Sequence, residues 1–226
     1  MKRIFMFRPC MRFRYRLGSV LFGMLCLTWQ ACNNQEKAAE TVEQPAKAYS
    51  LFTNMDRPPL ENTNQNDKQP IEVGVKFKTT VDGVVNGIRF YKGSEDSTVH
   101  VGNLWTNEGA NMATASFDSV NGEGWKEVIF AAPVPVKAGQ VYVASTFSPG
   151  GFYCSTIQSF NEEKVSGPLV ALQNTDTLEH NGVFSYCPGD SSTFPRSGFS
   201  SPNYWVDVIF TPDKPLSDSI SASANH

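Results

Sequence analysis

The side chains best suited to chemistry in this sequence are aromatic rings, an amide and a guanidinium between residues 148 and 204. They are Phe152, Tyr153, Phe184, Tyr186, Phe194, Arg196, Phe199, Asn203 and Tyr204. Flat rings bind the apolar face of a sugar, while amides, carboxylates or guanidiniums orient its hydroxyl groups. This mixture predicts a carbohydrate-binding surface, although the same rings could instead pack in the core. The residues expected to contact the ligand are Tyr153, Tyr186, Arg196, Tyr204, Trp205 and His100.

Motifs that mark common enzymes are missing from the sequence. There is no Gly-x-Ser-x-Gly, His-Glu-x-x-His or Cys-x-x-Cys motif and no phosphate-binding glycine loop. His100 lies between two valines of a predicted strand, which favours a structural role over catalysis. A carboxylate pair for glycoside hydrolysis depends on separation in space, and the sequence singles out no such pair. We therefore predict a non-catalytic protein, with a small glycan-active hydrolase as an alternative.

Three charged residues, Glu72, Arg89 and Asp207, alternate with apolar residues in predicted strands. If these strands adjoin, Arg89 is expected to pair with one of the carboxylates across a sheet. The alternative is a structural Ca²⁺ held by Glu72 and Asp207, since calcium binds about six to eight oxygen ligands. We favour the ion pair, because a nearby cation disfavours a metal site. No other cofactor is expected.

The pattern that must position these residues is a hydrophobic alternation with a period of two. It is clearest in residues 71–77, 88–91 and 204–210 and continues in shorter runs at 99–101, 112–117, 125–130, 141–147 and 182–186. Turn signals separate the runs, among them Asp82-Gly83, Asn86-Gly87, Asn121-Gly122, Ala138-Gly139 and Asn181-Gly182. About eight or more short strands without a long amphipathic helix predict an all-β antiparallel β-sandwich or jelly roll.

Residues 1–31 have the pattern of an export signal. Six basic residues precede an apolar run at 17–27, and Ala31-Cys32 follows. A cysteine after a small residue resembles the lipobox of bacterial lipoproteins, which implies acylation of Cys32; an ordinary secretory signal is the alternative. Residues 32–48 are too polar to fold, so we expect them to form a flexible tether. We expect residues 213–226 to form a disordered tail. We expect a lipid-anchored protein of the bacterial cell envelope, at the outer membrane, either periplasmic or surface-exposed.

The net charge limits the classes of binding partner, and the cysteines indicate a covalent link. Beyond residue 31 the chain has 13 basic and 22 acidic residues, a formal charge of −9. Such a surface repels phosphate backbones, which argues against nucleic-acid binding, and it leaves the lipid as the only membrane attachment. Cys154 and Cys187 remain for the folded part, and two cysteines in an exported chain predict a disulfide. Two free, buried thiols are the alternative.

Several segments, in order and spacing, resemble a known family. They include residues 50–52, 71–77, 87–93, 100–105, 124–125, 142–145 and 203–210. Together they resemble the bacterial domain of unknown function 4082, over about residues 49–212. The resemblance implies an extracellular β-sandwich, often part of larger secreted proteins, some of which act on carbohydrates; it implies no catalytic residues. We therefore expect carbohydrate binding or cell-surface adhesion, with a glycan or a cell-surface protein as partner. The alternative is a protein-interaction or scaffold subunit of a cell-envelope complex.

Overall fold

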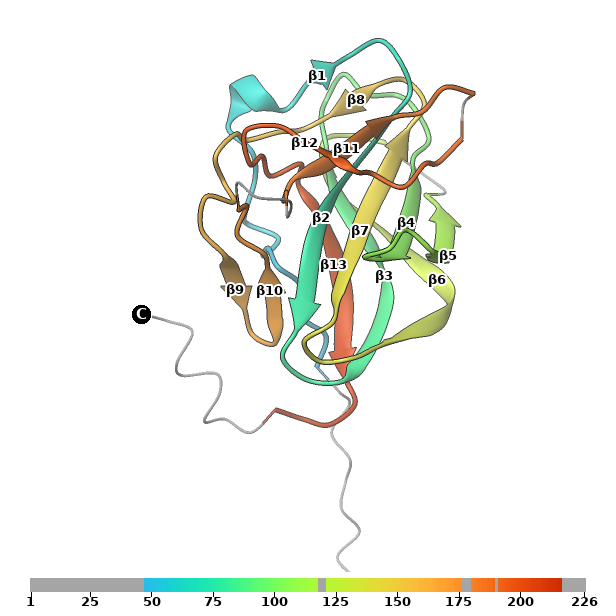
Figure 1. Ribbon diagram of the computed structural model, residues 1–226. Coiled ribbons are helices and arrows are strands. Elements are labelled where there is room, and N and C mark those ends of the chain that lie inside the picture. Colours follow the sequence, from blue (N-terminus) through green and yellow to red (C-terminus); the bar gives the residue numbers. More distant parts are fainter. Residues whose placement is uncertain (1–46, 118–120, 176–179, 190, 217–226) are drawn as a thin grey trace, which may run out of the picture. The chain divides into compact units, whose positions relative to one another are not determined.

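The computed structural model describes residues 47–117, 121–175, 180–189 and 191–216. These residues form thirteen strands and one turn of 3-10 helix, η1 (Leu60–Asn62). Figure 1 shows how these elements are arranged. All strand pairs are antiparallel. The all-β, sandwich-like fold predicted from the alternation is confirmed. The predicted signal, Cys32 and most of the predicted tether lie outside the described residues, as do residues 217–226 of the predicted tail.

The strands form three sheets. The largest has the order β12-β11-β2-β7-β4-β5, with β10 also paired to β2 and β9 to β10. Its strands are β2 (Ile71–Thr79), β4 (Val101–Thr106), β5 (Asn111–Ser116), β7 (Val141–Ser148), β9 (Lys164–Ser166), β10 (Leu169–Ala171), β11 (Val183–Tyr186) and β12 (Ser197–Gly198). The second sheet has the order β13-β3-β6, from β3 (Gly83–Lys92), β6 (Gly124–Val136) and β13 (Val206–Pro212). The short strands β1 (Gln65–Asn66) and β8 (Phe152–Tyr153) pair at one end of the domain.

The hydrophobic core lies between the two larger sheets. Every second residue of β2, from Ile71 to Phe77, is buried there, and so are Val206, Val208 and Phe210 of β13. Phe77 and Phe210 are fully buried, and each contributes about 1.5–3 kcal/mol of transfer free energy. The alternation in the sequence therefore identified the inward faces of the strands that flank the core.

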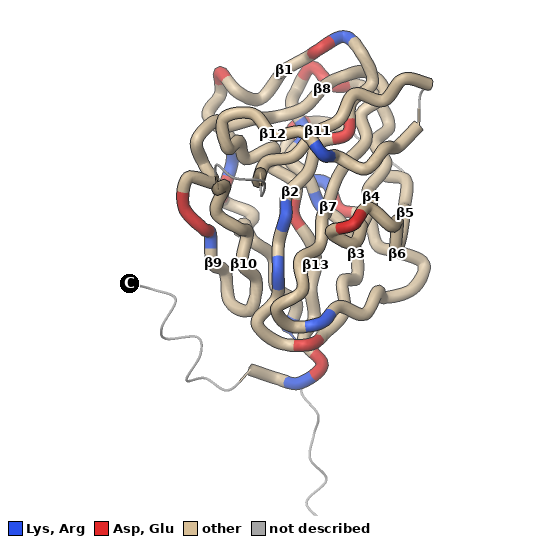
Figure 2. The backbone as a smooth tube through the Cα atoms, viewed as in Figure 1, with Lys and Arg blue, Asp and Glu red and all other residues tan. Residues whose placement is uncertain are grey.

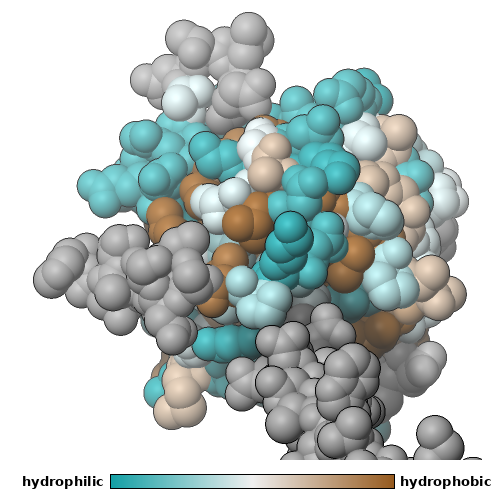
Figure 3. Space-filling view, turned by 90° about the horizontal axis from the view of Figure 1, so that it is seen from below, coloured by the Kyte–Doolittle hydropathy of each residue, from teal (hydrophilic) through white to brown (hydrophobic). Residues whose placement is uncertain are grey.

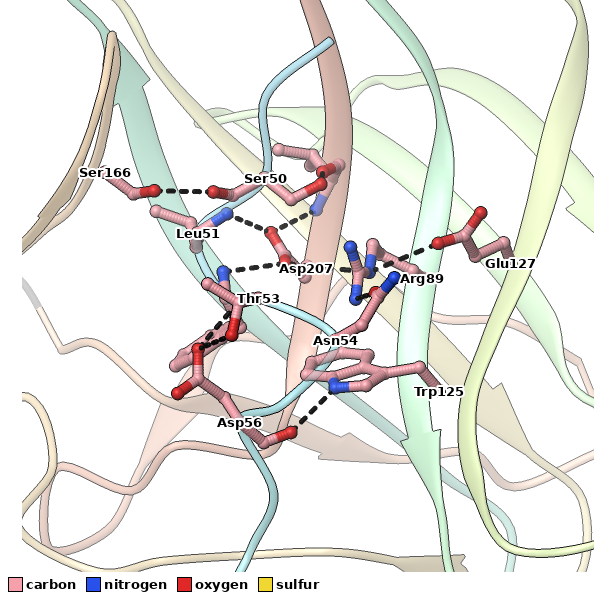
Figure 4. A network of polar contacts seen from close by, with 12 residues as sticks. Ser50, Leu51, Thr53, Asn54, Asp56, Arg89, Trp125, Glu127, Ser166 and Asp207 are labelled. Atoms are coloured by element: carbon pink, nitrogen blue, oxygen red, sulfur yellow. Dashed lines mark hydrogen bonds and ion pairs between the residues drawn. The ribbon is translucent and has the colours of Figure 1, made fainter. Parts of the chain in front are cut away.

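The predicted pairing of Arg89 with a carboxylate is confirmed. Arg89 on β3 and Asp207 on β13 are cross-strand partners, with 3.8 Å between Arg89 Nε and Asp207 Oδ2. Arg89 also lies 3.6 Å from Glu127 and over the ring of Trp125, and it donates to Asn54 (Figure 4). The guanidinium of Arg89 is thus in contact with two carboxylates, one amide and one aromatic ring.

Asp207 also fixes the segment that precedes η1. Its two carboxylate oxygens accept the backbone N–H groups of Leu51 at 2.8 Å and Phe52 at 3.0 Å (Figure 4). Glu72, the other candidate ligand for calcium, lies in the eight-stranded sheet and hydrogen-bonds Ser145 and Asn103 instead. Glu72 and Asp207 lie in different sheets and bind different partners. The structure therefore does not bring the two carboxylates together around one ion.

The predicted disulfide between Cys154 and Cys187 is not formed, and both residues are free and buried. Cys154 follows β8, packs in the core and donates from Sγ to the carbonyl of Thr63 at 3.1 Å. Cys187 follows β11, and its Sγ donates to the carbonyl of Ser185 at 3.5 Å. Burial raises the pKa of both thiols, that of Cys154 to about 12. Each thiol is therefore an inert part of the interior.

No helix in the described part of the chain has the length and hydropathy needed to cross a bilayer.

Candidate functional site

A pocket of about 280 Å³ opens at the end of the domain where β2 begins. Its walls come from β8, from β11, from the segment after β1 and from the segments on either side of residue 200. Figure 1 shows β1, β8, β11 and β12 gathered at this end. The lining residues are Asp67, Ile71, Tyr153, Phe184, Tyr186, Phe199 and Tyr204. The pocket therefore combines five aromatic rings with one carboxylate.

A tight turn after β1 holds Asp67 in place. Lys68 adopts a φ of 57°, and its N–H donates to the side chain of Asn66 at 2.7 Å. The N–H of Asp67 donates to the carbonyl of Gly151 at 3.1 Å. Gly151 has a φ of 76°, and a Cβ there would lie 2.7 Å from the carbonyl oxygen of Gln69. Because only glycine fits this close approach, residues 149–151 anchor the turn that carries the carboxylate.

Two tyrosine hydroxyls bind the carboxylate of Asp67. The hydroxyl of Tyr153 donates to Oδ1 at 3.2 Å, and that of Tyr186 donates to Oδ2 at 2.9 Å. Burial, followed by the negative charge of Asp67, raises the pKa of Tyr153. The hydrogen bond to Asp67 raises the pKa of Tyr186. Both hydroxyls therefore stay protonated and keep donating, which orients the carboxylate toward the cavity.

The rings form a floor and a rim. Tyr204 is buried and meets Tyr153 edge to face, with 5.6 Å between ring centroids. Phe184 and Tyr186 make a similar contact at 5.7 Å. Phe199 is 68% exposed and Tyr186 is 45% exposed. A ligand can thus reach two rings at the mouth without any movement of the core.

The pocket brings together three of the six predicted ligand contacts, Tyr153, Tyr186 and Tyr204. Arg196 does not line it: its guanidinium packs over the ring of Phe194, 5.6 Å from the centroid. Sequence reasoning missed Asp67, which lies in a short polar stretch with no motif of its own. Its role depends on the pairing of β1 with β8, which are far apart in the chain.

Two other predicted contacts, Trp205 and His100, lie in the interior and do not line the pocket. Trp205 is only 8% exposed, packs against Phe52 with the two rings tilted, and donates from Nε1 to Thr156 at 3.0 Å. His100 is 1% exposed, and its Nε2 lies 2.5 Å from Asp96 Oδ2. Neither ring offers a surface to a ligand, because packing already covers both. Their placement is that of structural residues.

A separate polar network covers the outer face of the eight-stranded sheet. Glu72 Oε1 accepts hydrogen bonds from Ser145 at 2.5 Å and Asn103 at 2.9 Å. Asn103 also donates to Ser192 at 3.1 Å, so residues 191–194 cover the carboxyl group. Burial raises the pKa of Glu72 to about 7, and Oε2 makes no hydrogen bond to a described residue. Among its described hydrogen-bond partners there is no second carboxylate of the kind that glycoside hydrolysis uses.

Elsewhere, charged groups are dispersed. Figure 2 shows basic and acidic residues interspersed along the backbone. Among the described residues, no group of three or more His, Cys, Asp and Glu side chains is arranged to hold a metal ion. The pocket around Asp67 is therefore the arrangement with the clearest chemistry for a ligand.

Comparison with known proteins agrees with the resemblance seen in the sequence. A search of curated proteins gives no match to the chain. The family model described as a domain of unknown function, DUF4082, matches residues 57–206. This match covers more than half of the chain and includes every residue that lines the pocket. The chain belongs to the DUF4082 family.

Proposed function

We propose that this protein is an exported, lipid-anchored β-sandwich that binds carbohydrate in the pocket around Asp67 and performs no catalysis. The observation that carries the proposal is the set of five rings around one oriented carboxylate. Rings supply the apolar surface on which the C–H face of a sugar stacks. The carboxylate supplies acceptors for the hydroxyl groups. One site can therefore bind both the apolar face and the hydroxyl groups of a sugar.

The size of the pocket limits the ligand. Its volume of about 280 Å³ is close to the lower end of ligand pockets, which span roughly 300–1,000 Å³. We therefore expect it to hold one sugar residue or the end of a glycan chain. Because Phe199 lies exposed at the mouth, the next sugar of a longer chain would extend past this ring into solvent.

The segment around Ser50 lies far from the pocket. The carbonyl of Ser50 accepts a hydrogen bond from Ser166 on β9, at the end of the domain where β2 finishes at Thr79. The pocket lies where β2 begins, and the nine residues of this strand separate the two ends by about 26 Å. Ser50 and Ser166 therefore lie at the end of the domain opposite the pocket.

The surface at this opposite end is mixed. Figure 3 views the domain from below, and hydrophobic residues form small, separate patches among hydrophilic ones where the surface is visible. This pattern does not suggest a large apolar docking face. It supports the assignment of recognition to the other end of the domain.

A protein-interaction role is the second candidate, and a groove of about 380 Å³ between β5 and β6 favours it. Its lining is mainly apolar, and each of the two strands pairs on one side only. However, Pro133 and Pro135 of β6 lack an N–H group, which weakens this edge as a template for a further strand. The pocket around Asp67 has the more specific chemistry, so carbohydrate binding remains the proposal.

A glycan array tests the proposed function. The full chain is applied with and without Ca²⁺, beside the variants Phe199→Ala and Ile129→Ala. Both residues are exposed, 68% and 60%, but only Phe199 lines the pocket. Loss of a stacking ring should weaken binding about tenfold, whereas Ile129→Ala should bind like the wild type. Absence of signal on every glycan, or equal signals from the two variants, would overturn the proposal.

A further inference from the structure

We infer that the pocket selects a positively charged sugar, a saccharide whose terminal residue carries a free amino group. This inference rests on the proposed function and specifies its ligand class. It is based on the negative charge of Asp67 in the pocket, because the binding of a neutral sugar does not require a charged group.

In the described part of the chain, no cationic side chain lies within ion-pair distance of the Asp67 carboxylate. Its two side-chain partners, Tyr153 and Tyr186, are neutral hydroxyl donors. Asp67 makes no ion pair with a described residue. The predicted guanidinium, Arg196, packs over Phe194 instead. Each carboxylate oxygen accepts one hydrogen bond from a tyrosine and keeps a lone pair for a further donor.

The surrounding rings favour the same sign of charge. The face of an aromatic ring carries partial negative charge and attracts a cation, typically by about 0.5–2 kcal/mol. Four phenyl or phenol rings besides that of Tyr204 border the cavity, and Tyr204 itself is buried at its floor. An ammonium group that reached Asp67 would be paired with a carboxylate in a pocket lined by aromatic rings. An acidic sugar at the same place would be repelled.

An amino sugar fits these features better than a neutral sugar does. Its ammonium group can donate to both oxygens of Asp67, while its ring C–H groups lie against the aromatic side chains. Acetylation of the amine removes the charge and adds bulk in a pocket of about 280 Å³. The pocket should therefore distinguish a free amine from an acetamide on the same sugar.

Isothermal titration calorimetry of the full chain tests this inference. The probes are the β-1,4-linked tetramers of glucosamine and of N-acetylglucosamine, with tetramethylammonium and lysine amide as cations that lack a sugar. The variant Asp67→Asn removes the charge but keeps an acceptor oxygen for one of the two tyrosine hydroxyls. Its control is Glu108→Gln, which removes one charge at an exposed position outside the pocket. Circular dichroism of each variant verifies that both are folded.

The expected result is at least tenfold tighter binding of the glucosamine tetramer than of the acetylated tetramer. Asp67→Asn should reduce this ratio to near one, and Glu108→Gln should preserve it. Equal or tighter binding of the acetylated tetramer to the wild type would overturn the charge selection but leave carbohydrate binding in place. If tetramethylammonium or lysine amide binds as tightly as the glucosamine tetramer, the assignment to an amino sugar is wrong. Absence of binding by both tetramers, together with a blank glycan array, would overturn both proposals.

Discussion

Replacement of Glu72 by glutamine should change how the stability of this domain depends on pH. Glu72 is buried on the outer face of the eight-stranded sheet, where burial raises its pKa from 4.5 to about 7. Hydrogen bonds from Ser145 and Asn103 to Oε1 lower the pKa but do not offset the burial. The folded protein therefore holds the proton of Glu72 more tightly than the unfolded chain does.

The sign and size of the effect follow from this difference. Below the unfolded pKa of 4.5, the carboxyl group is neutral in both states, and Glu72 is compatible with its buried position. Between pH 4.5 and about 7, the unfolded chain releases this proton while the folded protein keeps it, so stability falls as the pH rises. Above the folded pKa of about 7, both states are ionised and the loss levels off. A difference of about 2.5 pKa units corresponds to about 3 kcal/mol. The amide of Glu72→Gln cannot ionise, so the variant should not show this loss.

Urea denaturation followed by tryptophan fluorescence at pH 5 and pH 8.5 measures the effect. Between the two pH values, the wild type should lose about 2.5 kcal/mol more unfolding free energy than Glu72→Gln, because a small part of the full effect is already lost at pH 5. Burial also raises the pKa of Asp207, to about 6, but Asp207 is present in both proteins and its contribution cancels. Glu108→Gln, at an exposed position, should follow the wild type. If the wild type and Glu72→Gln differ equally at both pH values, Glu72 does not carry the raised pKa.

Three further predictions concern the anchor, the thiols and the ion pair. Cys32→Ala should abolish incorporation of labelled palmitate and release the protein from membranes; a variant that stays bound would refute the lipid anchor. Titration with a thiol reagent should find Cys154 and Cys187 unreactive in the folded protein and both reactive after denaturation without reductant, since both are free and buried. Asp207→Ala leaves the buried Arg89 without this carboxylate and removes the acceptor of the Leu51 and Phe52 N–H groups. It should lower the unfolding free energy by about 3–5 kcal/mol, measured by urea denaturation, and a loss below about 1 kcal/mol would contradict the anchoring role.

Much of the fold could be predicted from the sequence, because the core strands alternate with a clear period of two. The same alternation predicted that Arg89 would meet a carboxylate, since both residues belong to strands that adjoin in the second sheet. Alternation cannot distinguish an outward face that meets solvent from one that another segment covers. This is why the burial of Glu72 beneath residues 191–194 could not be predicted.

The candidate site was only partly predictable for related reasons. Tyr153, Tyr186 and Tyr204 belong to an aromatic-rich region that the composition identifies, and the fold brings them into one pocket. Trp205 follows in the same run, but its φ of 55° interrupts the extended backbone, and its ring enters the core. Asp67 precedes the core strands and reaches the pocket through the pairing of two-residue strands. Such short pairs leave almost no pattern in a sequence.

Tyrosine-selective ¹³C NMR of the full chain tests most directly whether the pocket binds carbohydrate. The chain contains seven tyrosines, of which Tyr153, Tyr186 and Tyr204 line the pocket. The spectrum is recorded during titration with the saccharide that gives the strongest array signal. The account predicts saturable shifts of the ring signals of these three residues, with Tyr49 and Tyr142 unchanged. Shifts confined to tyrosines outside the pocket, or no shift at a saccharide concentration that saturates binding, would contradict it.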